Sequence, residues 1–254
     1  MEIEPGDAVD VDTILEHLAT AETPLLFGVF PRVLEYETYD PNVLARDLER
    51  IERAYRARGY YEAKVTAARV VRLDEHHVRV EIRVYEGKPV RVAKVPDTPG
   101  LGSMPIEYAD ASNAATLAIK TAKGDIFDEA RFEADKDRIR DALRARGFAF
   151  AKVEGRATVD VAKHSAQVTY LIEPGLPANY GEINIVGLKE IPEGPVRDAL
   201  RLKKGRPYSR TQVVDAERAL LNLGVFSRVE IREDLQHPEG SVVPLTVVVA
   251  EANL

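Results

Sequence analysis

Apolar residues recur at every second position in three stretches of the chain, and each stretch is typical of a β-strand. Every second residue is apolar in the set Val80, Ile82, Val84, the set Val168, Tyr170, Ile172 and the set Leu245, Val247, Val249. Because successive side chains of a strand point to opposite faces, this pattern predicts three strands with one packed and one solvated face. The stretches follow one another after 88 and then 77 residues, which indicates a repeated module.

A helical pattern precedes each strand. In the first copy apolar residues recur at i, i+4, i+7 and i+11 between a cap at Asp40-Pro41 and a stop at Gly59. The corresponding faces are Leu44, Leu48, Ile51 and Tyr55, then Phe132, Lys136, Ile139 and Leu143, then Val213, Ala216 and Leu220. Lys136 departs from the apolar face, and its aliphatic stem can lie along the groove. The sequence therefore predicts one long helix in each copy.

The glycine that ends the long helix marks three copies. Gly59 returns as Gly147 after 88 residues and, in a more diverged copy, as Gly224 after a further 77 residues. Upstream of the long helices the pattern predicts strands near Ile3, at 90–95 and at 180–186, and shorter helices at 10–20, within 106–122 and at 192–202. The chain is therefore predicted to be an α+β protein of three tandem β-α-α-β-β repeats covering 1–88, 89–175 and 176–254.

A valine-rich strand is predicted directly after each long helix, at 62–71, 151–159 and 227–232. In the first of these the alternation slips at Ala67-Ala68, which predicts a β-bulge. A Pro- and Gly-rich loop is predicted at 96–105. The joints at 87–89 and 174–177 are short and contain proline, so neighbouring repeats are expected to hold a limited range of angles.

Composition narrows the class of function. Lys and Arg total 35 against 42 Asp and Glu, and the charges are interspersed, so no basic stripe is available for nucleic acid. The chain has no cysteine, hence no disulfide framework and no thiolate metal site. No uncharged apolar run approaches the roughly 20 residues of a spanning helix, and the segment after Met1 is acidic where a signal peptide would be basic. We expect either a cytosolic protein or a fragment of a longer one.

Signals of catalysis are weak. Gly100 and Gly102 continue into Pro105 and so fail the dinucleotide-binding pattern, and no phosphate-binding Gly-x-x-x-x-Gly-Lys loop is present. Acidic pairs such as Glu133 and Asp135 fit ordinary surface charge on a helix. We therefore expect no enzyme, no cofactor and no metal site.

Two groups of residues have a structural and a functional interpretation. The neighbours His76-His77 would face opposite sides of a strand, which makes them a poor chelate and favours a surface hairpin turn. The aromatic residues that follow the helix ends could fill the core or form a contact patch, and their matching positions in two repeats favour the core. These residues are Tyr60, Tyr61, Phe148 and Phe150.

A β-α-α-β-β repeat with these helix entries and exits resembles the POTRA domain. The motifs that carry the resemblance are Tyr39-Asp40, Arg58-Gly59-Tyr60-Tyr61, Ala63-Lys64-Val65, Phe127-Asp128, Arg146-Gly147-Phe148, Lys204-Gly205-Arg206-Pro207-Tyr208-Ser209 and Gly224-Val225-Phe226-Ser227. POTRA tandems form the periplasmic arms of outer-membrane β-barrel assembly proteins such as BamA and TamA, and the resemblance covers about residues 2–251. It implies three-stranded mixed sheets packed by two helices, a periplasmic location and a membrane β-barrel that begins shortly after residue 254. Three repeats match the arm of TamA better than the five of BamA, and a truncated arm would give the same count.

The resemblance implies a substrate- and partner-binding arm for outer-membrane protein assembly or translocation. Such an arm is expected to engage unfolded barrel precursors or periplasmic accessory proteins by adding a strand to an exposed sheet edge. The predicted edges are the strands that follow the long helices. The candidate edge-strand residues are Lys64, Val65, Thr66, Val70, Lys152, Val153, Val159, Arg228, Val229 and Ile231.

Two other functions stay open. A structural spacer would dock an inner-membrane or periplasmic partner without touching substrate, and the arm of a secretion-type barrel would serve export of a passenger. The apolar insertion at 25–34 in the first repeat has no counterpart in the others, and it is either a local extension of the core or a contact surface. Its candidate contact residues are Leu25, Leu26, Phe27 and Phe30. Open edges favour the first function, whereas an exposed apolar patch with blocked edges favours the spacer.

Overall fold

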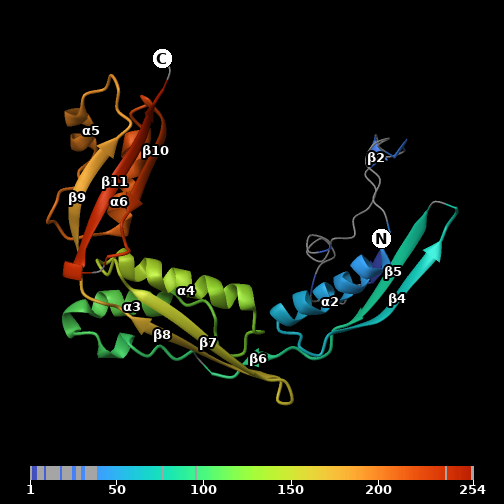
Figure 1. Cartoon of the computed structure of the whole chain (residues 1–254). Coiled ribbons are helices and arrows are strands. Elements are labelled where there is room, and N and C mark those ends of the chain that lie inside the picture. Colours follow the sequence, from blue (N-terminus) through green and yellow to red (C-terminus); the bar gives the residue numbers. More distant parts are fainter. Residues whose placement is uncertain are drawn as a thin grey trace. The chain divides into compact units, whose positions relative to one another are not determined.

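The computed structural model describes residues 2–4, 9, 18, 25–26, 30–31, 39–75, 77–94, 96–237 and 239–252. By its internal contacts the chain divides into two compact units, and the division passes through the middle repeat. The first unit is Met1–Val95 with Thr121–Phe132 and Ala157–Val168, and the second is Pro96–Lys120 with Glu133–Arg156 and Thr169–Leu254. The described residues form five α-helices and three three-stranded sheets (Figure 1), which confirms the predicted α+β class.

The first sheet contains β1 (Glu2–Glu4), β5 (Val78–Tyr85) and β4 (Lys64–Arg72), in this order. The middle strand β5 is parallel to β1 and antiparallel to β4, so the sheet is mixed. The register between β4 and β5 shifts between Val65 and Ala67, which confirms the predicted bulge. Val80, Ile82 and Val84 are buried, as their alternation predicts.

The long helix α2 (Pro41–Ala57) covers this sheet. It begins as predicted, because the Asp40 side chain accepts a hydrogen bond of 2.7 Å from Asn42 N and proline occupies the first turn. Its predicted inner face is confirmed, since Leu44, Ile51 and Tyr55 are buried and Leu48 packs against the same core. Hydrophobic burial of this face therefore fixes the helix on the sheet.

The second sheet has the order β6 (Arg91–Val92), β8 (Ser165–Glu173), β7 (Lys152–Asp160). Its helices are α3 (Ala109–Ala118) and the long helix α4 (Glu129–Arg144), so the predicted helix within 106–122 is confirmed. The named strand β6 is only two residues long, but the pairing continues. Tyr170 N donates to Asp97 O at 2.8 Å, and Ile172 N donates to Pro99 O at 3.0 Å.

The prediction of a loop over all of 96–105 is therefore wrong at its beginning. Residues 97–99 lie along β8, and the chain turns away only at Gly100. A Cβ atom at Gly100 would lie 1.8 Å from Ile172 O, and its φ is +103°, so the turn at this strand edge requires glycine. Proline and glycine here end a strand extension, which a composition rule for loops does not distinguish from a loop.

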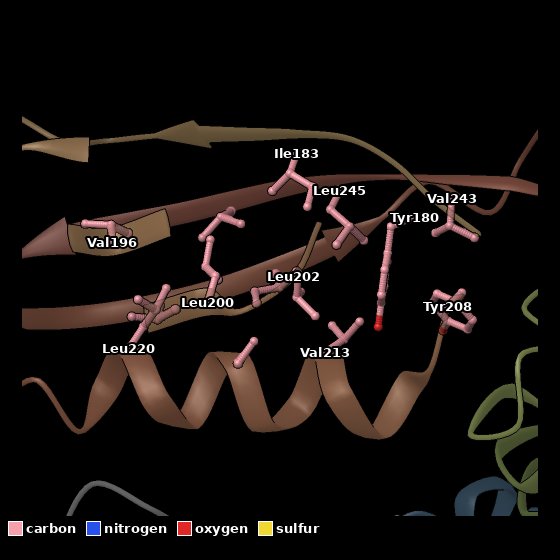
Figure 2. Packing of buried hydrophobic residues seen from close by; sticks show 14 of the residues in the cluster. Tyr180, Ile183, Val196, Leu200, Leu202, Tyr208, Val213, Leu220, Val243 and Leu245 are labelled. Carbon is pink, nitrogen blue, oxygen red and sulfur yellow. The ribbon is translucent and has the colours of Figure 1, made fainter. Parts of the chain in front are cut away.

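The third sheet has the order β9 (Asn179–Val186), β11 (Val242–Glu251), β10 (Phe226–Glu233). Helices α5 (Glu193–Leu200) and α6 (Arg210–Leu221) pack on it. Figure 2 shows Val213 and Leu220 of α6 pointing toward the strands, with Tyr180 reaching from β9 toward the helix. The rings of Tyr180 and Tyr208 meet edge to face with centroids 5.6 Å apart. Each long helix thus buries the face that its periodicity predicts.

The described residues of the apolar insertion pair with one another. Strands β2 (Leu25–Leu26) and β3 (Phe30–Pro31) pair antiparallel as a separate two-stranded sheet. Phe27 and His76 lie outside the described residues, and of the predicted helix at 10–20 only Leu18 lies within them. No helix in the described part of the chain is long and apolar enough to cross a membrane.

Candidate partner-binding edges

Each sheet leaves the strand after its long helix with a single neighbour. In the described part of the chain β4, β7 and β10 stand at the ends of their sheets, beside β5, β8 and β11. In the second and third sheets the opposite edges are partly covered: Val92 N donates to Asp125 O, and Tyr180 N donates to Arg206 O, both at 2.9 Å. Because an edge strand presents N–H and C=O groups that an extended peptide can pair with, β4, β7 and β10 are the candidate binding edges.

The predicted edge residues differ in what they can offer a partner. The side chains of Val153, Val229 and Ile231 belong to the cores and are 8%, 6% and 6% exposed, so a peptide can reach these residues only through their backbone. Lys64, Val70, Lys152 and Arg228 are exposed, Val65 and Val159 are half-buried, and the side chain of Thr66 lies outside the described part.

A glutamate already occupies the start of the β4 edge. Glu52 Oε1 on α2 accepts a hydrogen bond of 3.2 Å from Val65 N, while Arg56 Nη2 donates to Glu52 Oε2 at 2.9 Å. A carboxylate of the chain itself therefore satisfies an amide at the beginning of this strand. Together with the bulge between Val65 and Ala67, it shortens the part of β4 that can take a partner.

A ladder of charges lies along β10. Glu230 accepts hydrogen bonds of 2.7 Å from both Arg228 and Arg232. The Arg232 guanidinium, and with it that of Arg228, lowers the pKa of Glu230, and Glu230 in turn raises the pKa of Arg232. Paired charges on an edge strand discourage the addition of another strand.

The third edge, β7, has neither a carboxylate bound to a strand amide nor an ion-paired row of charges among its described contacts. Lys152, Glu154 and Arg156 are exposed on one side of the strand, and none of them forms an ion pair with a described residue. In the described structure β7 therefore lacks the strand-bound carboxylate of β4 and the ion-paired charges of β10, and it carries exposed charges of its own.

Asp135 is a correction to the sequence analysis, which took it for surface charge. Its side chain is fully buried, accepts from Tyr170 Oη at 2.9 Å and from Lys120 N at 2.7 Å, and is bound by Arg138. Arg138 Nε also donates to Ala118 O at 3.2 Å, so the pair holds the end of α3. A buried carboxylate is stable only with such partners.

The first repeat has an equivalent buried aspartate paired with an arginine, and the sequence shows this pair at the repeat spacing. Asp47, 88 residues before Asp135, is also fully buried, and Arg50 Nη1 lies 2.6 Å from Asp47 Oδ1. Aspartate followed by arginine three residues later returns at the repeat spacing. A charge pair kept by a repeat that otherwise varies on its surface indicates a structural role.

Of the four aromatic residues after the helix ends, Phe148 is buried, Tyr60 and Phe150 are half-buried and packed against the cores, and Tyr61 is half-buried. Phe148 is 2% exposed and meets Tyr108 edge to face at 5.2 Å, and Tyr60 meets Tyr55 at 6.3 Å. His77 lies at the β4–β5 turn, where its Nδ1 is 2.7 Å from Asp74 Oδ2. Of the apolar candidates, the backbones of Leu25, Leu26 and Phe30 are described within the β2–β3 hairpin, and their side chains are not.

The joints between repeats are tied by hydrogen bonds. Within the first compact unit Val90 N donates to Gly59 O at 2.8 Å. Within the second, Ala178 N donates to Gly147 O at 2.8 Å. Gly59 and Gly147 end equivalent helices, so each joint fastens the next strand to the same point of the preceding repeat. No group of three His, Cys, Asp or Glu side chains that could hold a metal ion occurs among the residues described.

Comparison with known families decides what this arrangement is. The model of the POTRA family, described as the surface antigen variable number repeat, matches residues 2–87, 114–175 and 178–252. The chain belongs to the POTRA family. The three matches follow one another along the chain, as expected for a POTRA tandem.

The relatives of this POTRA chain are outer-membrane assembly factors. It is 21% identical over 204 residues to the outer membrane protein assembly factor BamA of Neisseria meningitidis, and the aligned region covers 80% of the chain and 25% of that protein. It is 24% identical over 177 residues to a putative outer membrane protein assembly factor of Treponema pallidum, covering 66% of the chain and 20% of the relative. The chain therefore spans about a quarter or less of the length of these relatives.

The fold matches a solved POTRA tandem over nearly the whole chain. The crystal structure of Haemophilus influenzae BamA POTRA3-5 aligns with a TM-score of 0.60 at 21% identity, covering 98% of this chain and 94% of that one. This match is a three-domain part of a BamA arm, so a count of three repeats does not separate a TamA-like from a BamA-like protein.

Proposed function

We propose that this POTRA tandem is the periplasmic substrate- and partner-binding arm of an outer-membrane protein assembly or translocation factor. Its three domains, 1–88, 89–175 and 176–254, engage unfolded barrel precursors or periplasmic accessory proteins by β-strand addition. The observation that supports this most is the open edge that each repeat leaves in the same topological position, at β4, β7 and β10. Backbone pairing at such an edge suits many clients, because it depends little on their side chains.

The test is an NMR titration of the isotopically labelled chain with a peptide from a membrane β-strand. We expect amide shifts concentrated on Lys64–Arg72, Lys152–Asp160 or Phe226–Glu233. A peptide of the same composition with proline at every second position is the control, since proline donates no hydrogen bond and cannot pair along an edge. Equal shifts with both peptides, or none with either while the fold stays intact, would refute strand addition.

A second function is a structural spacer that docks a partner without contact to substrate. The hydrogen-bonded joints at Gly59 and Gly147 favour it, because a spacer has to hold its length and direction. The two functions separate in the same titration. A spacer shows no amide shifts at the three edges when the peptide is added. Its partner shifts amides elsewhere.

A further inference from the structure

The start of β7 differs from the start of β4 by a reversed charge. Glu52, whose carboxylate accepts from the Val65 amide, corresponds 88 residues later to Arg140, and a further 77 residues later to Glu217. Arg56, which binds that carboxylate in the first repeat, is kept as Arg144. Only the second repeat therefore carries a cation where the other two carry a carboxylate.

Arginine cannot replace glutamate in this position. It has no acceptor atom, so Arg140 cannot accept a hydrogen bond from the amide of Val153, the residue that corresponds to Val65. In the described structure Arg140 Nη1 binds Asp137 at 2.6 Å, and no described side chain accepts from Val153 N. The second repeat thus keeps the surroundings of a bound carboxylate and lacks the carboxylate.

A groove opens at this place. It lies between the end of α4, the start of β7 and the loop after β10. Arg140, Arg144, Lys152 and Glu154 are its charged lining residues, and Arg140 is paired with Asp137. Arg144 Nε donates to Ala149 O at 3.1 Å, which fixes the guanidinium beside the strand. Lys152 is exposed and has no partner among the described residues.

The groove also has apolar walls. Phe150 and Leu235 line it, and both are partly buried against the core of the third repeat. The groove lies at one end of the open edge β7, so a strand paired with β7 would continue into it. Its occupant therefore needs a carboxylate, a neighbouring apolar side chain and an extended backbone.

We propose that the groove binds the carboxylate of an extended polypeptide paired with β7, in the place that the Glu52 carboxylate holds in the first repeat. This rests on the proposed function and adds a chemical preference to it: β7 selects segments that carry an acidic side chain, which takes the place that the Glu52 side chain holds in the first repeat, and β4 does not. Charge-assisted hydrogen bonds to Arg144 and to the strand amide supply the preference.

The test uses the whole chain and three ten-residue peptides of alternating apolar and polar residues. One has a central Glu, its twin has Gln, both with amidated ends, and the third has Gln and a free C-terminus. We expect the Glu peptide to shift the Lys152, Val153 and Glu154 amides with about fivefold tighter binding than the amidated Gln peptide, which is the range of a partly exposed ion pair. A gain by the peptide with the free C-terminus alone would show that the groove takes a chain end and would overturn the preference for an acidic side chain.

Two exchanged variants make the test specific. Arg140→Glu restores the arrangement of the first repeat and should abolish the preference at β7, whereas Glu52→Arg should create it at β4. Arg140→Gln is a milder second variant with a smaller loss. Arg156→Glu, on the same strand outside the groove, is the control for charge alone and should keep most of the preference.

The outcomes separate this inference from the proposed function. Binding at β7 that is equal for all three peptides, or a preference that survives Arg140→Glu, overturns the inference and leaves strand addition intact. Absence of shifts at every edge with every peptide overturns strand addition, and the inference with it.

Discussion

Glu62 of the first repeat and His164 of the second lie 3.3 Å apart, measured from Oε2 to Nε2. The same carboxylate oxygen accepts a hydrogen bond of 3.3 Å from the Lys88 amide in the joint. His164 Nε2 is buried, and Glu62 is the carboxylate that lies beside it. The joint at Lys88 and the turn at His164 thus meet at the Glu62 carboxylate, and all three residues belong to the first compact unit.

This contact predicts a pH dependence of the joint. The Lys88 N–H, and after it the His164 imidazole, lowers the pKa of Glu62 below its ordinary 4.5. A carboxyl group with a lower pKa in the folded state stabilises the fold above its unfolded pKa, and this contribution is lost as the pH falls through the folded pKa. We expect the Lys88 amide shift to titrate with a midpoint below 4.5. The transition should vanish in Glu62→Gln and move upward in His164→Ala. A midpoint at or above 4.5 in the unchanged chain would contradict it.

Removing the buried carboxylate of Asp135 should destabilise the second repeat. Asp135→Ala removes the carboxylate that accepts from Arg138, Tyr170 Oη and Lys120 N, and we expect a loss of about 3 kcal/mol in the free energy of unfolding. The matched control is Asp137→Ala, an exposed residue on the same helix, with an expected change within about 0.5 kcal/mol. Urea unfolding followed at second-repeat amides measures both, since the repeats need not unfold together. Equal losses in the two variants would contradict a structural role of Asp135.

Gly100→Ala should disrupt the end of the β6 extension. The new methyl group would lie 1.8 Å from Ile172 O in a backbone with φ +103°, and we expect a loss of about 3 kcal/mol from strain and displacement together. Gly175→Ala is the control, because its φ is +72° with nothing within 4 Å of the added carbon. It isolates the left-handed backbone term of about 1 kcal/mol. Should Gly100→Ala lose no more than this control, the close approach to Ile172 O is not what requires glycine.

Ser209 precedes α6, yet its hydroxyl serves the joint. Ser209 Oγ donates to Ala145 O of the second repeat at 2.9 Å and does not cap its own helix. Ser209→Ala should cost about 1 kcal/mol and speed hydrogen exchange of the Ala178 amide, which is bonded across the same joint. Ser227→Ala removes a hydroxyl bond within the third repeat and is the control. Unchanged exchange at Ala178 would show that the hydroxyl does not hold the joint.

The sequence predicted those parts of the fold that depend on periodic burial. The faces of α2, α4 and α6, the alternating strands and the bulge at Val65–Ala67 all follow from side chains that must meet a core. It did not predict the burial of Asp135, because an aspartate on a helix normally faces water and its partners lie on other elements. The strand extension at 97–99 was missed because backbone pairing there leaves no pattern in the side chains.

The candidate edges were less accessible to sequence reasoning. Periodicity predicts a strand but not its place within a sheet, so the edge position of β4, β7 and β10 came from the resemblance. The contrast between Glu52 and Arg140 stands in the sequence at the repeat spacing. The contrast indicates a difference in carboxylate binding only once the hydrogen bond from Val65 N to Glu52 is known, and the structure shows that bond.

The register shift in β4 bears on how the protein behaves at high concentration. A bulge bends its strand and interrupts the even spacing of the backbone N–H and C=O groups on the open edge. The β4 strand of one molecule therefore cannot pair over its whole length with β4 of another. A short guest needs only the regular stretch at 67–72. The β4 edge can therefore pair with a short peptide and still resist continuous strand pairing between molecules, which is what fibre growth requires.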